Sequence, residues 1–239
     1  MIIAAGRGTR LNAHSKDAPK SLISIGTKSI IETILTTLRQ ASVSDVIIVT
    51  GYKHDILEQQ LGDGSSHSMK VRYVYNEEWQ KKNGVSVYAA RDMFAADEKF
   101  LLMMSDHIFS DDLLQKIIAY PLNTGEVVLA VDTRIGSVFD IDDATKVQVE
   151  AGVIRTIGKE LPEFNGVDCG LFKCTTGIFD ALRVAMSTEG DCSLTEGGME
   201  LARRGKFKAV PIGDGWWVDI DTPEALNHAI GMMRPSKPE

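Results

Sequence analysis

The chain opens with a short apolar run that stops at a glycine-containing turn, and this arrangement constrains the fold more than any other feature. The run covers residues 2–5, and the turn contains Gly6 and Gly8. Glycine reaches backbone angles that are closed to other residues, and its missing side chain lets amide N–H groups approach an anion closely. Arg10 adds a planar donor suited to phosphate oxygens, and Lys20 adds a compact positive charge. The strand, the turn and the two cations together predict a cradle for a polyphosphate.

Two well-known phosphate cradles do not match this turn. A dinucleotide-binding fingerprint needs a third glycine where Leu11 stands, and a P-loop needs a glycine where Pro19 precedes Lys20. A strand followed by an ordinary glycine turn with solvated basic residues is the alternative. The short motif by itself favours neither, so the rest of the chain has to decide.

Strands alternate with helices over the next hundred residues. We expect strands at 45–50, 70–75, 100–104 and 127–131, and helices at 29–41, 53–61, 85–94 and 110–119. This alternation predicts an α/β fold built on a Rossmann-like, doubly wound, mostly parallel sheet that is covered on both faces. Ligands of such sheets bind beyond the carboxyl ends of the strands, where Gly6, Gly51 and Asp106 all fall. That agreement favours the cradle.

The regular alternation of strands and helices ends after residue 131. We expect a hairpin of strands 145–150 and 153–157, then strands 167–173, 207–212 and 216–220 and helices 177–186, 193–203 and 222–233. These elements predict a single domain over residues 1–233, in which residues 132–175 form a small β-rich lobe over the site. Residues 234–239 are polar and proline-rich, which is typical of a tail or linker.

Composition excludes several classes of function. The 239 residues, 44% of them hydrophobic, are enough for one large domain with a substantial core. A net charge of −7 argues against nucleic acid or an anionic membrane as the main partner, because both favour basic surfaces. Cys169, Cys174 and Cys192 are too unevenly spaced for a disulfide framework or a zinc site. With no signal peptide and no apolar run of spanning length, we expect a soluble, cytoplasmic protein.

Three aspartates are candidates for holding a divalent cation. Asp106 follows a predicted strand, and Asp219 and Asp221 lie two residues apart, so an extended backbone would point both to one face. Carboxylates repel a nearby polyphosphate, by about 4 kcal/mol for two unit charges roughly 4 Å apart at an effective dielectric of about 20. Mg²⁺ removes this conflict by coordinating carboxylate and phosphate oxygens together. We therefore expect Mg²⁺ on Asp106 and Asp219, with Asp221 as a further candidate ligand.

Structural roles compete with this prediction at some of these positions. Asp106 could cap a turn, and Asp221 fits the N-cap of the following helix with Glu224 at its third position. Asp219 has no such role available, which makes it the better second ligand. His107 invites a metal or base role, but Mg²⁺ prefers oxygen ligands, so a hydrogen-bonded loop histidine is favoured.

Residues 4–11 (AAGRGTRL) with residues 19–22 (PKSL) resemble the signature loop of the nucleotidyltransferases that activate phosphorylated sugars and alcohols, a MobA-like superfamily. The resemblance spans nearly the whole chain and implies the nucleotide-diphospho-sugar transferase fold. It also implies that the loop wraps a nucleoside triphosphate, that its two cations bind the phosphates, and that Asp106 and Asp219 hold Mg²⁺.

Later segments more specifically resemble CTP:inositol-1-phosphate cytidylyltransferases, namely residues 83–86, 104–107, 144–147, 157–161, 164–170 and 217–222. This resemblance implies that CTP and inositol 1-phosphate give CDP-inositol and pyrophosphate, a step of phospholipid biosynthesis. Phosphocholine, aminoethylphosphonate and hexose 1-phosphates stay open as acceptors, and so does UTP in place of CTP. The alternative from another class is a non-catalytic nucleotide-binding module of the same fold.

The expected site has four groups of residues. The catalytic residues are Arg10, Lys20 and Asp106, and the metal ligands are Asp106, Asp219 and Asp221. The nucleotide-binding residues are Ala4, Ala5, Gly6, Arg7, Gly8, Thr9, Lys20, Thr50, Gly51, Tyr52, Asn83, Gly84 and Ser105. The acceptor-binding residues are Lys146, Asp168 and Glu196, each of which could equally be a surface charge. The resemblance also implies a membrane-embedded phosphotransferase as a fused or separate partner, whereas this domain itself would contact neither membrane nor nucleic acid.

Overall fold

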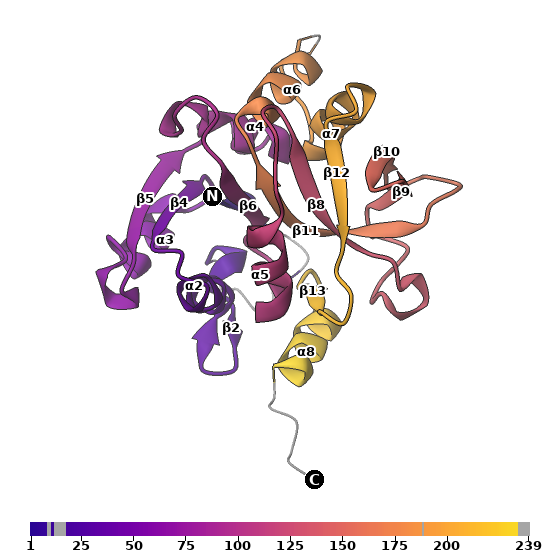
Figure 1. Ribbon diagram of the computed structural model, residues 1–239. Helices are drawn as coiled ribbons and strands as arrows, with labels where there is room; N and C mark the ends of the chain where they lie inside the picture. Colours follow the sequence, from indigo (N-terminus) through magenta and orange to yellow (C-terminus); the bar gives the residue numbers. More distant parts are fainter. Residues whose placement is uncertain (9–10, 12–17, 188, 234–239) are drawn as a thin grey trace.

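A nine-stranded mixed sheet forms the centre of the computed structural model, which describes residues 1–8, 11, 18–187 and 189–233 (Figure 1). The strand order across the sheet is β5-β4-β1-β6-β11-β8-β12-β10-β9. In chain order the strands are β1 (Ile2–Ala4), β4 (Asp45–Thr50), β5 (Lys70–Tyr75), β6 (Phe100–Met104), β8 (Val127–Asp132), β9 (Lys146–Glu150), β10 (Val153–Gly158), β11 (Gly166–Cys174) and β12 (Phe207–Pro211).

The first four strands of the sheet are parallel, as the alternation of strands and helices predicted. β1 pairs in parallel with both β4 and β6, and β5 pairs in parallel with β4. β1, β4 and β6 are mostly apolar and largely buried, because helices cover both faces of the sheet, whereas the edge strand β5 is more exposed. Since they are parallel, their carboxyl ends meet at one edge of the molecule.

The remainder of the sheet differs from the prediction. β11 is antiparallel to both of its neighbours, β6 and β8, so the sheet as a whole is mixed. The predicted hairpin forms from β9 and β10, but β10 also pairs with β12 and β9 with β11. The strands within residues 132–175 therefore extend the central sheet. A hairpin pattern shows which two strands pair with each other, but it does not show which further strands they join.

Helices cover the two faces of the sheet and bury a separate apolar core on each. The helices are α2 (Ile30–Gln40), α3 (His54–Leu61), α4 (Asn83–Ala89), α5 (Asp111–Ala119), α6 (Gly177–Ala185), α7 (Leu194–Arg203) and α8 (Pro223–Met232). Leu35 of α2 and Leu114 of α5 belong to one core, and Val87 of α4, Leu182 of α6 and Leu201 of α7 belong to the other. No helix within the described ranges is long and apolar enough to cross a membrane.

The helix boundaries follow local capping chemistry. Ser29 begins α2 and Ser193 begins α7, as predicted, and each forms a capping box with the glutamate three residues later. The helix predicted at 85–94 is shorter, because α4 ends at Ala89 and a 3₁₀ turn follows. Phe94 leaves this turn to stack on Phe100 at the start of β6, with the ring centroids 4.0 Å apart.

Two short two-stranded sheets lie outside the central sheet. β2 (Ser24–Ile25) pairs with β3 (Lys28–Ser29), and β7 (His107–Phe109) pairs antiparallel with β13 (Trp217–Asp219). The sequence predicted a strand at 216–220 but did not predict β7, because three residues are too few to establish an alternating pattern. The β7–β13 pair joins the segment after β6 to the segment before α8.

Gly84 provides a test of how closely α4 packs on the chain leading into α7. A Cβ atom at this position would lie 2.6 Å from the carbonyl oxygen and 2.8 Å from the sulfur of Cys192. Because such overpacking typically costs about 1–3 kcal/mol, we expect Gly84→Ala to lower the free energy of unfolding by about that amount in urea titrations. Gly231→Ala in α8, where no atom lies within 4 Å, is the control. Equal stability of the two variants would contradict this packing.

Candidate active site

The β7–β13 pair brings the predicted aspartates together. His107 on β7 lies opposite Asp219 on β13, and the amide of Ile220 donates to the carbonyl oxygen of Asp106 at 2.9 Å. These residues follow β6, at the edge where the carboxyl ends of the parallel strands meet. Side chains from the middle and the end of the sequence therefore share one position beside the glycine turn.

The ammonium group of Lys20 lies between two of the aspartates. It donates to Oδ2 of Asp106 at 2.8 Å and to Oδ1 of Asp221, and the lysine is only 7% exposed. Burial opposes the charge on Lys20, but the carboxylates of Asp106 and Asp221 outweigh it and raise the pKa of the lysine. Burial likewise disfavours the Asp106 carboxylate, yet Lys20 and His107 hold its pKa well below the usual range. Lys20 and Asp106 are therefore an ion pair at neutral pH.

His107 belongs to the same cluster. Its Nδ1 atom lies 2.7 Å from Oδ1 of Asp106 and 3.8 Å from Oδ1 of Asp219. Burial opposes the charged imidazole, but Asp219 and Asp106 together raise the pKa of His107 to about 9. The sequence favoured a hydrogen-bonded loop histidine. The hydrogen bond to Asp106 is present, but the sequence did not predict that His107 lies inside the site.

Asp219 carries a buried oxygen atom that accepts no hydrogen bond from the described part of the chain. Its Oδ1 makes no hydrogen bond to any described residue, and burial together with the nearby carboxylates raises the pKa of Asp219 to about 6. An unpaired buried carboxylate oxygen is costly and is commonly explained by an ion. Ligand atoms of Asp106, His107 and Asp219 lie within 4.8 Å of one another, so the donor set fits a small cation.

Asp221 does not have the capping role that the sequence left open for it. Thr222 is the N-cap of α8, and its hydroxyl accepts the amide of Ala225 at 3.1 Å. The carboxylate of Asp221 instead receives the Lys20 ammonium. The N-cap prediction for Asp221 is therefore wrong by one residue, and the side chain is available to the charged cluster.

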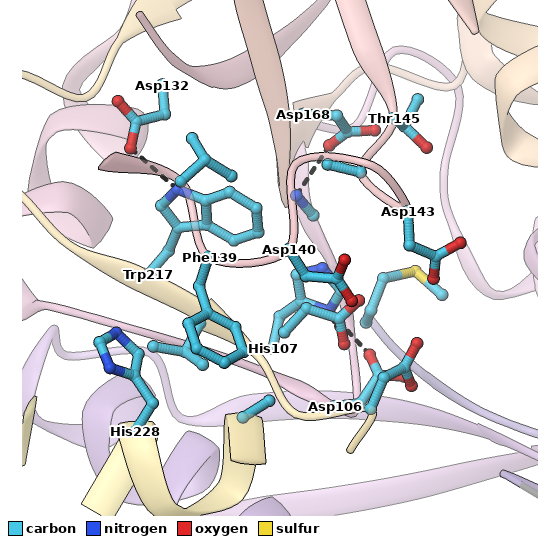
Figure 2. A pocket seen from close by; sticks show the side chains of 18 of the residues that line it. Asp106, His107, Asp132, Phe139, Asp140, Asp143, Thr145, Asp168, Trp217 and His228 are labelled. Atoms are coloured by element: carbon cyan, nitrogen blue, oxygen red, sulfur yellow. Dashed lines mark hydrogen bonds and ion pairs between the residues drawn. The ribbon is translucent and has the colours of Figure 1, made fainter. Parts of the chain in front are cut away.

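Two cavities meet at this cluster. The smaller, of about 350 Å³, lies beside the glycine turn, and the larger, of about 460 Å³, lies between β11, β13, α8 and residues 134–145. Figure 2 shows Asp140, Asp143 and Asp168 around the larger cavity with Asp106 at its side. The residues that line both cavities are Asn83, Met104, Asp106 and Asp221. A molecule in one cavity would therefore approach a molecule in the other at the carboxylates.

Part of the predicted nucleotide-binding set lines the smaller cavity. These residues are Ala4, Gly6, Gly8, Lys20, Asn83 and Ser105. Gly8 has φ of +61°, and a Cβ atom there would lie 2.5 Å from Cβ of Lys20, so glycine is required for the lysine to reach the aspartates. Thr9 and Arg10 lie outside the described residues.

The other predicted nucleotide-binding residues, Ala5, Arg7, Thr50, Gly51, Tyr52 and Gly84, do not line this cavity. The hydroxyl of Thr50 donates to Glu58 at 2.9 Å, and Gly51 approaches the side chain of Trp79. The Arg7 guanidinium lies 5.4 Å from the ring centroid of Tyr52. Thr50, Gly51 and Arg7 thus contact neighbouring residues of the fold.

The predicted acceptor-binding residues separate in the structure. Asp168 lines the larger cavity, and its Oδ1 accepts the amide of Gly170 at 2.7 Å. Lys146 and Glu196 do not line it. The Lys146 ammonium donates to the carbonyl oxygen of Lys159 at 2.9 Å, and Glu196 completes the cap of α7 and pairs with a surface lysine.

The sequence did not single out a network that borders the larger cavity. The guanidinium of Arg134 makes two hydrogen bonds to the buried Asp132, at 3.0 and 3.1 Å, and the indole N–H of Trp217 donates to the same carboxylate at 3.1 Å. Phe139 and His228 also line the cavity, and their rings stack with the centroids 4.9 Å apart. The sequence did not predict this network, because Asp132 and Arg134 are two residues apart but Trp217 comes from a distant segment.

Asp168 makes stability depend on pH. Burial raises the pKa of its carboxyl group from 3.8 to about 6, so between these values the folded chain keeps a proton that the unfolded chain has lost. The free energy of unfolding should therefore fall as pH rises through this window. Asp168→Asn keeps an acceptor for Gly170 but does not ionise. We expect its stability relative to wild type to increase by about 2 kcal/mol between pH 4 and pH 7 in urea titrations. A difference that stays constant with pH would contradict this.

Comparison with known proteins agrees with the geometry. The chain matches the family model described as "Nucleotidyl transferase" over residues 1–234. It is 32% identical over 237 residues to the bifunctional IPC transferase and DIPP synthase of Rubrobacter xylanophilus, covering 97% of this chain and 51% of that protein. It is also 28% identical over 237 residues to the UTP–glucose-1-phosphate uridylyltransferase AglF of Haloferax volcanii, covering 96% and 93% of the two chains.

A solved structure shares the fold. The inositol-1-phosphate CTP transferase from T. maritima superposes with a TM-score of 0.83 at 24% identity, covering 98% of this chain and 96% of that one. The chain spans about half the length of the bifunctional relatives that it matches. Because the family model covers nearly all of the sequence, this chain belongs to the nucleotidyl transferase family and is an enzyme of the EC 2.7.7 type.

Proposed function

We propose that this enzyme transfers the cytidylyl group of CTP to inositol 1-phosphate, giving CDP-inositol and pyrophosphate, with Mg²⁺ as cofactor. The observation that carries the proposal is the pair of cavities that share Asp106 and Asp221, since transfer between two bound phosphates requires such a junction. The IPC transferase relatives support the choice of substrates. Similarity to a uridylyltransferase keeps a hexose 1-phosphate acceptor as the second candidate.

In the proposed reaction a phosphate oxygen of the acceptor attacks the α-phosphorus of the nucleotide. The bond from the α-phosphorus to the bridging oxygen breaks, and pyrophosphate leaves with the electron pair. A phosphomonoester is largely ionised near neutral pH, since its second pKa is about 6, so no general base is required. The enzyme's task is then to position the two phosphates and to balance their charge.

Lys20 is the residue that we propose for the charge at the α-phosphoryl group. Its ammonium lies at the junction of the two cavities, in contact with Asp106. Asp106 and Asp219 would hold the cation, with Asp221 beside them, and Mg²⁺ when bound neutralises phosphate charge. We keep Arg10 as the proposed ligand of the leaving phosphates.

Carboxylates in the larger cavity suit a polyol. Asp140, Asp143 and Asp168 line it, and carboxylate oxygens accept strong hydrogen bonds from hydroxyl groups. Lys159, which pairs with Asp143 at 2.6 Å, and Arg134 supply positive charge to the same cavity. A compact body with several hydroxyl groups and one phosphate matches this lining, and inositol 1-phosphate has that chemistry.

Pyrophosphate release measures the proposed activity directly. With CTP and Mg²⁺ we expect the largest kcat/KM for inositol 1-phosphate among a panel that includes phosphocholine, aminoethylphosphonate and hexose 1-phosphates. UTP in place of CTP tests the choice of nucleotide. Faster release with another acceptor would reassign the substrate. Tight CTP binding without release for any acceptor would instead indicate a non-catalytic module.

Lys20 and Asp106 should be essential for rate. Removing one positioned charge from such a site typically costs about 10²–10³-fold. We therefore expect Lys20→Ala and Asp106→Ala each to lower kcat by about that factor while the circular dichroism spectrum stays native. Lys28→Ala, at an exposed lysine on β3, is the control and should keep wild-type turnover. Wild-type kcat in either site variant would be incompatible with the assigned roles.

We also propose that the product passes to a membrane phosphotransferase, fused or separate. The names of the bifunctional relatives pair an IPC transferase with a DIPP synthase in chains about twice as long as the matched region. A CDP-alcohol is an activated form from which an alcohol phosphate can be transferred to an acceptor, and this supports phospholipid biosynthesis as the proposed context.

A further inference from the structure

The imidazole of His107 occupies a space that the fold provides through a glycine. Gly170 lies in β11 with φ of +69°, and a Cβ atom there would come within 2.4 Å of Cδ2 and 2.8 Å of Nε2 of His107. The pairing of β11 with β8 shifts register between Asp168 and Phe172, around this glycine. Such irregularities re-aim side chains next to active sites. Only a residue without a side chain lets the ring lie where it does.

The ring also stacks on Trp217. The two rings are nearly parallel, at 10°, with centroids 5.9 Å apart. The indole is held in turn by its hydrogen bond to Asp132, a buried carboxylate that Arg134 also contacts. The backbone of β11 and a hydrogen-bonded tryptophan thus both limit the position of the His107 ring.

In this position His107 is hydrogen-bonded to Asp106 and lies near Asp219. An ionised carboxylate only accepts hydrogen bonds, so the Nδ1 atom 2.7 Å from Oδ1 of Asp106 must carry the proton. This bond leaves Oδ2 of Asp106 facing Lys20. Oδ1 of Asp219 lies 3.8 Å from the same nitrogen and has no hydrogen bond to a described residue.

We propose that His107 is a positioning residue that fixes the carboxylate of Asp106 by a hydrogen bond and places a positive charge beside Asp219, so that the two aspartates can hold a divalent cation, and that Gly170 makes its position possible. The inference rests on the proposed function only in needing a cation site. Mg²⁺ is a hard ion that prefers oxygen, so the two aspartates are the ligands and the imidazole holds them. Residues that orient the ligands of a metal in this way typically change its affinity by about 10–100-fold when they are mutated.

Two glycine variants separate displacement of the ring from backbone strain. Gly170→Ala places a methyl group against His107, whereas Gly152→Ala introduces the same residue at a φ of +75° with no atom within 4 Å. Mn²⁺ binding in the presence of CTP, followed by electron paramagnetic resonance, is the readout. We expect Gly170→Ala to weaken Mn²⁺ binding by about 10–100-fold and Gly152→Ala by less than about threefold. Equal Mn²⁺ affinity in the two variants would overturn the proposal.

Two histidine variants test the hydrogen bond and guard against a misfolded glycine variant. The amide nitrogen of asparagine lies two bonds from Cβ, as Nδ1 does, so His107→Asn keeps the donor to Asp106 and His107→Phe removes it. We expect Mn²⁺ affinity near wild type for His107→Asn and a loss of about 10–100-fold for His107→Phe. Raising the Mg²⁺ concentration should restore turnover in His107→Phe. Equal losses in both variants would show that His107 is itself a ligand and overturn the positioning role.

The outcomes also separate this inference from the proposed function. Pyrophosphate release by wild type, with no effect of Gly170→Ala or His107→Phe on Mn²⁺ affinity, would overturn the inference alone. Mn²⁺ binding that depends on His107, without release for any acceptor, would support the inference and overturn the reaction. A wild-type protein that binds no Mn²⁺ with CTP would overturn the inference together with the proposed role of Mg²⁺.

Discussion

The ion pair between Lys20 and Asp106 is the interaction on which the rest of the site depends. A carboxylate that leaves water without a partner would lose its charge, because burial of an isolated ion is far more costly than protonation. Lys20 comes from the segment after the glycine turn, Asp106 from the end of β6, and Asp221 from the segment before α8. Charge compensation therefore ties three distant segments to one edge of the sheet.

Both cations of this cluster lie against a glycine in the left-handed region of backbone space. Gly8 leaves room for the stem of Lys20, and Gly170 leaves room for the ring of His107. A side chain at either glycine would press on the cation and through it on the aspartates. Glycine serves a different purpose at Gly84, where it permits close packing between elements. The conformational freedom of glycine is thus used at this site to place positive charge beside negative charge.

The larger cavity exists because the sheet is mixed. β11 enters antiparallel beside β6 and carries Asp168 and Gly170 to the edge where the parallel strands end. Residues 134–145 and α8 close the other side, with Phe139 stacked on His228 (Figure 2). A purely parallel sheet would offer the crevice beside the glycine turn, whereas the antiparallel insertion adds the wall of a second binding space. This is the arrangement that a two-substrate transfer requires.

Local patterns in the sequence determined a large part of this structure. Apolar patterns predicted the parallel strands and the starts of α2 and α7, and the rule for carboxyl ends placed Asp106 beside the glycine turn. The pairing of β7 with β13, the antiparallel insertion of β11 and the place of His107 were decided by tertiary structure. The reason is physical: periodicity and capping are set by neighbours within a few residues, whereas strand partners, enclosed cavities and charge pairs depend on segments that meet only when the whole chain is packed.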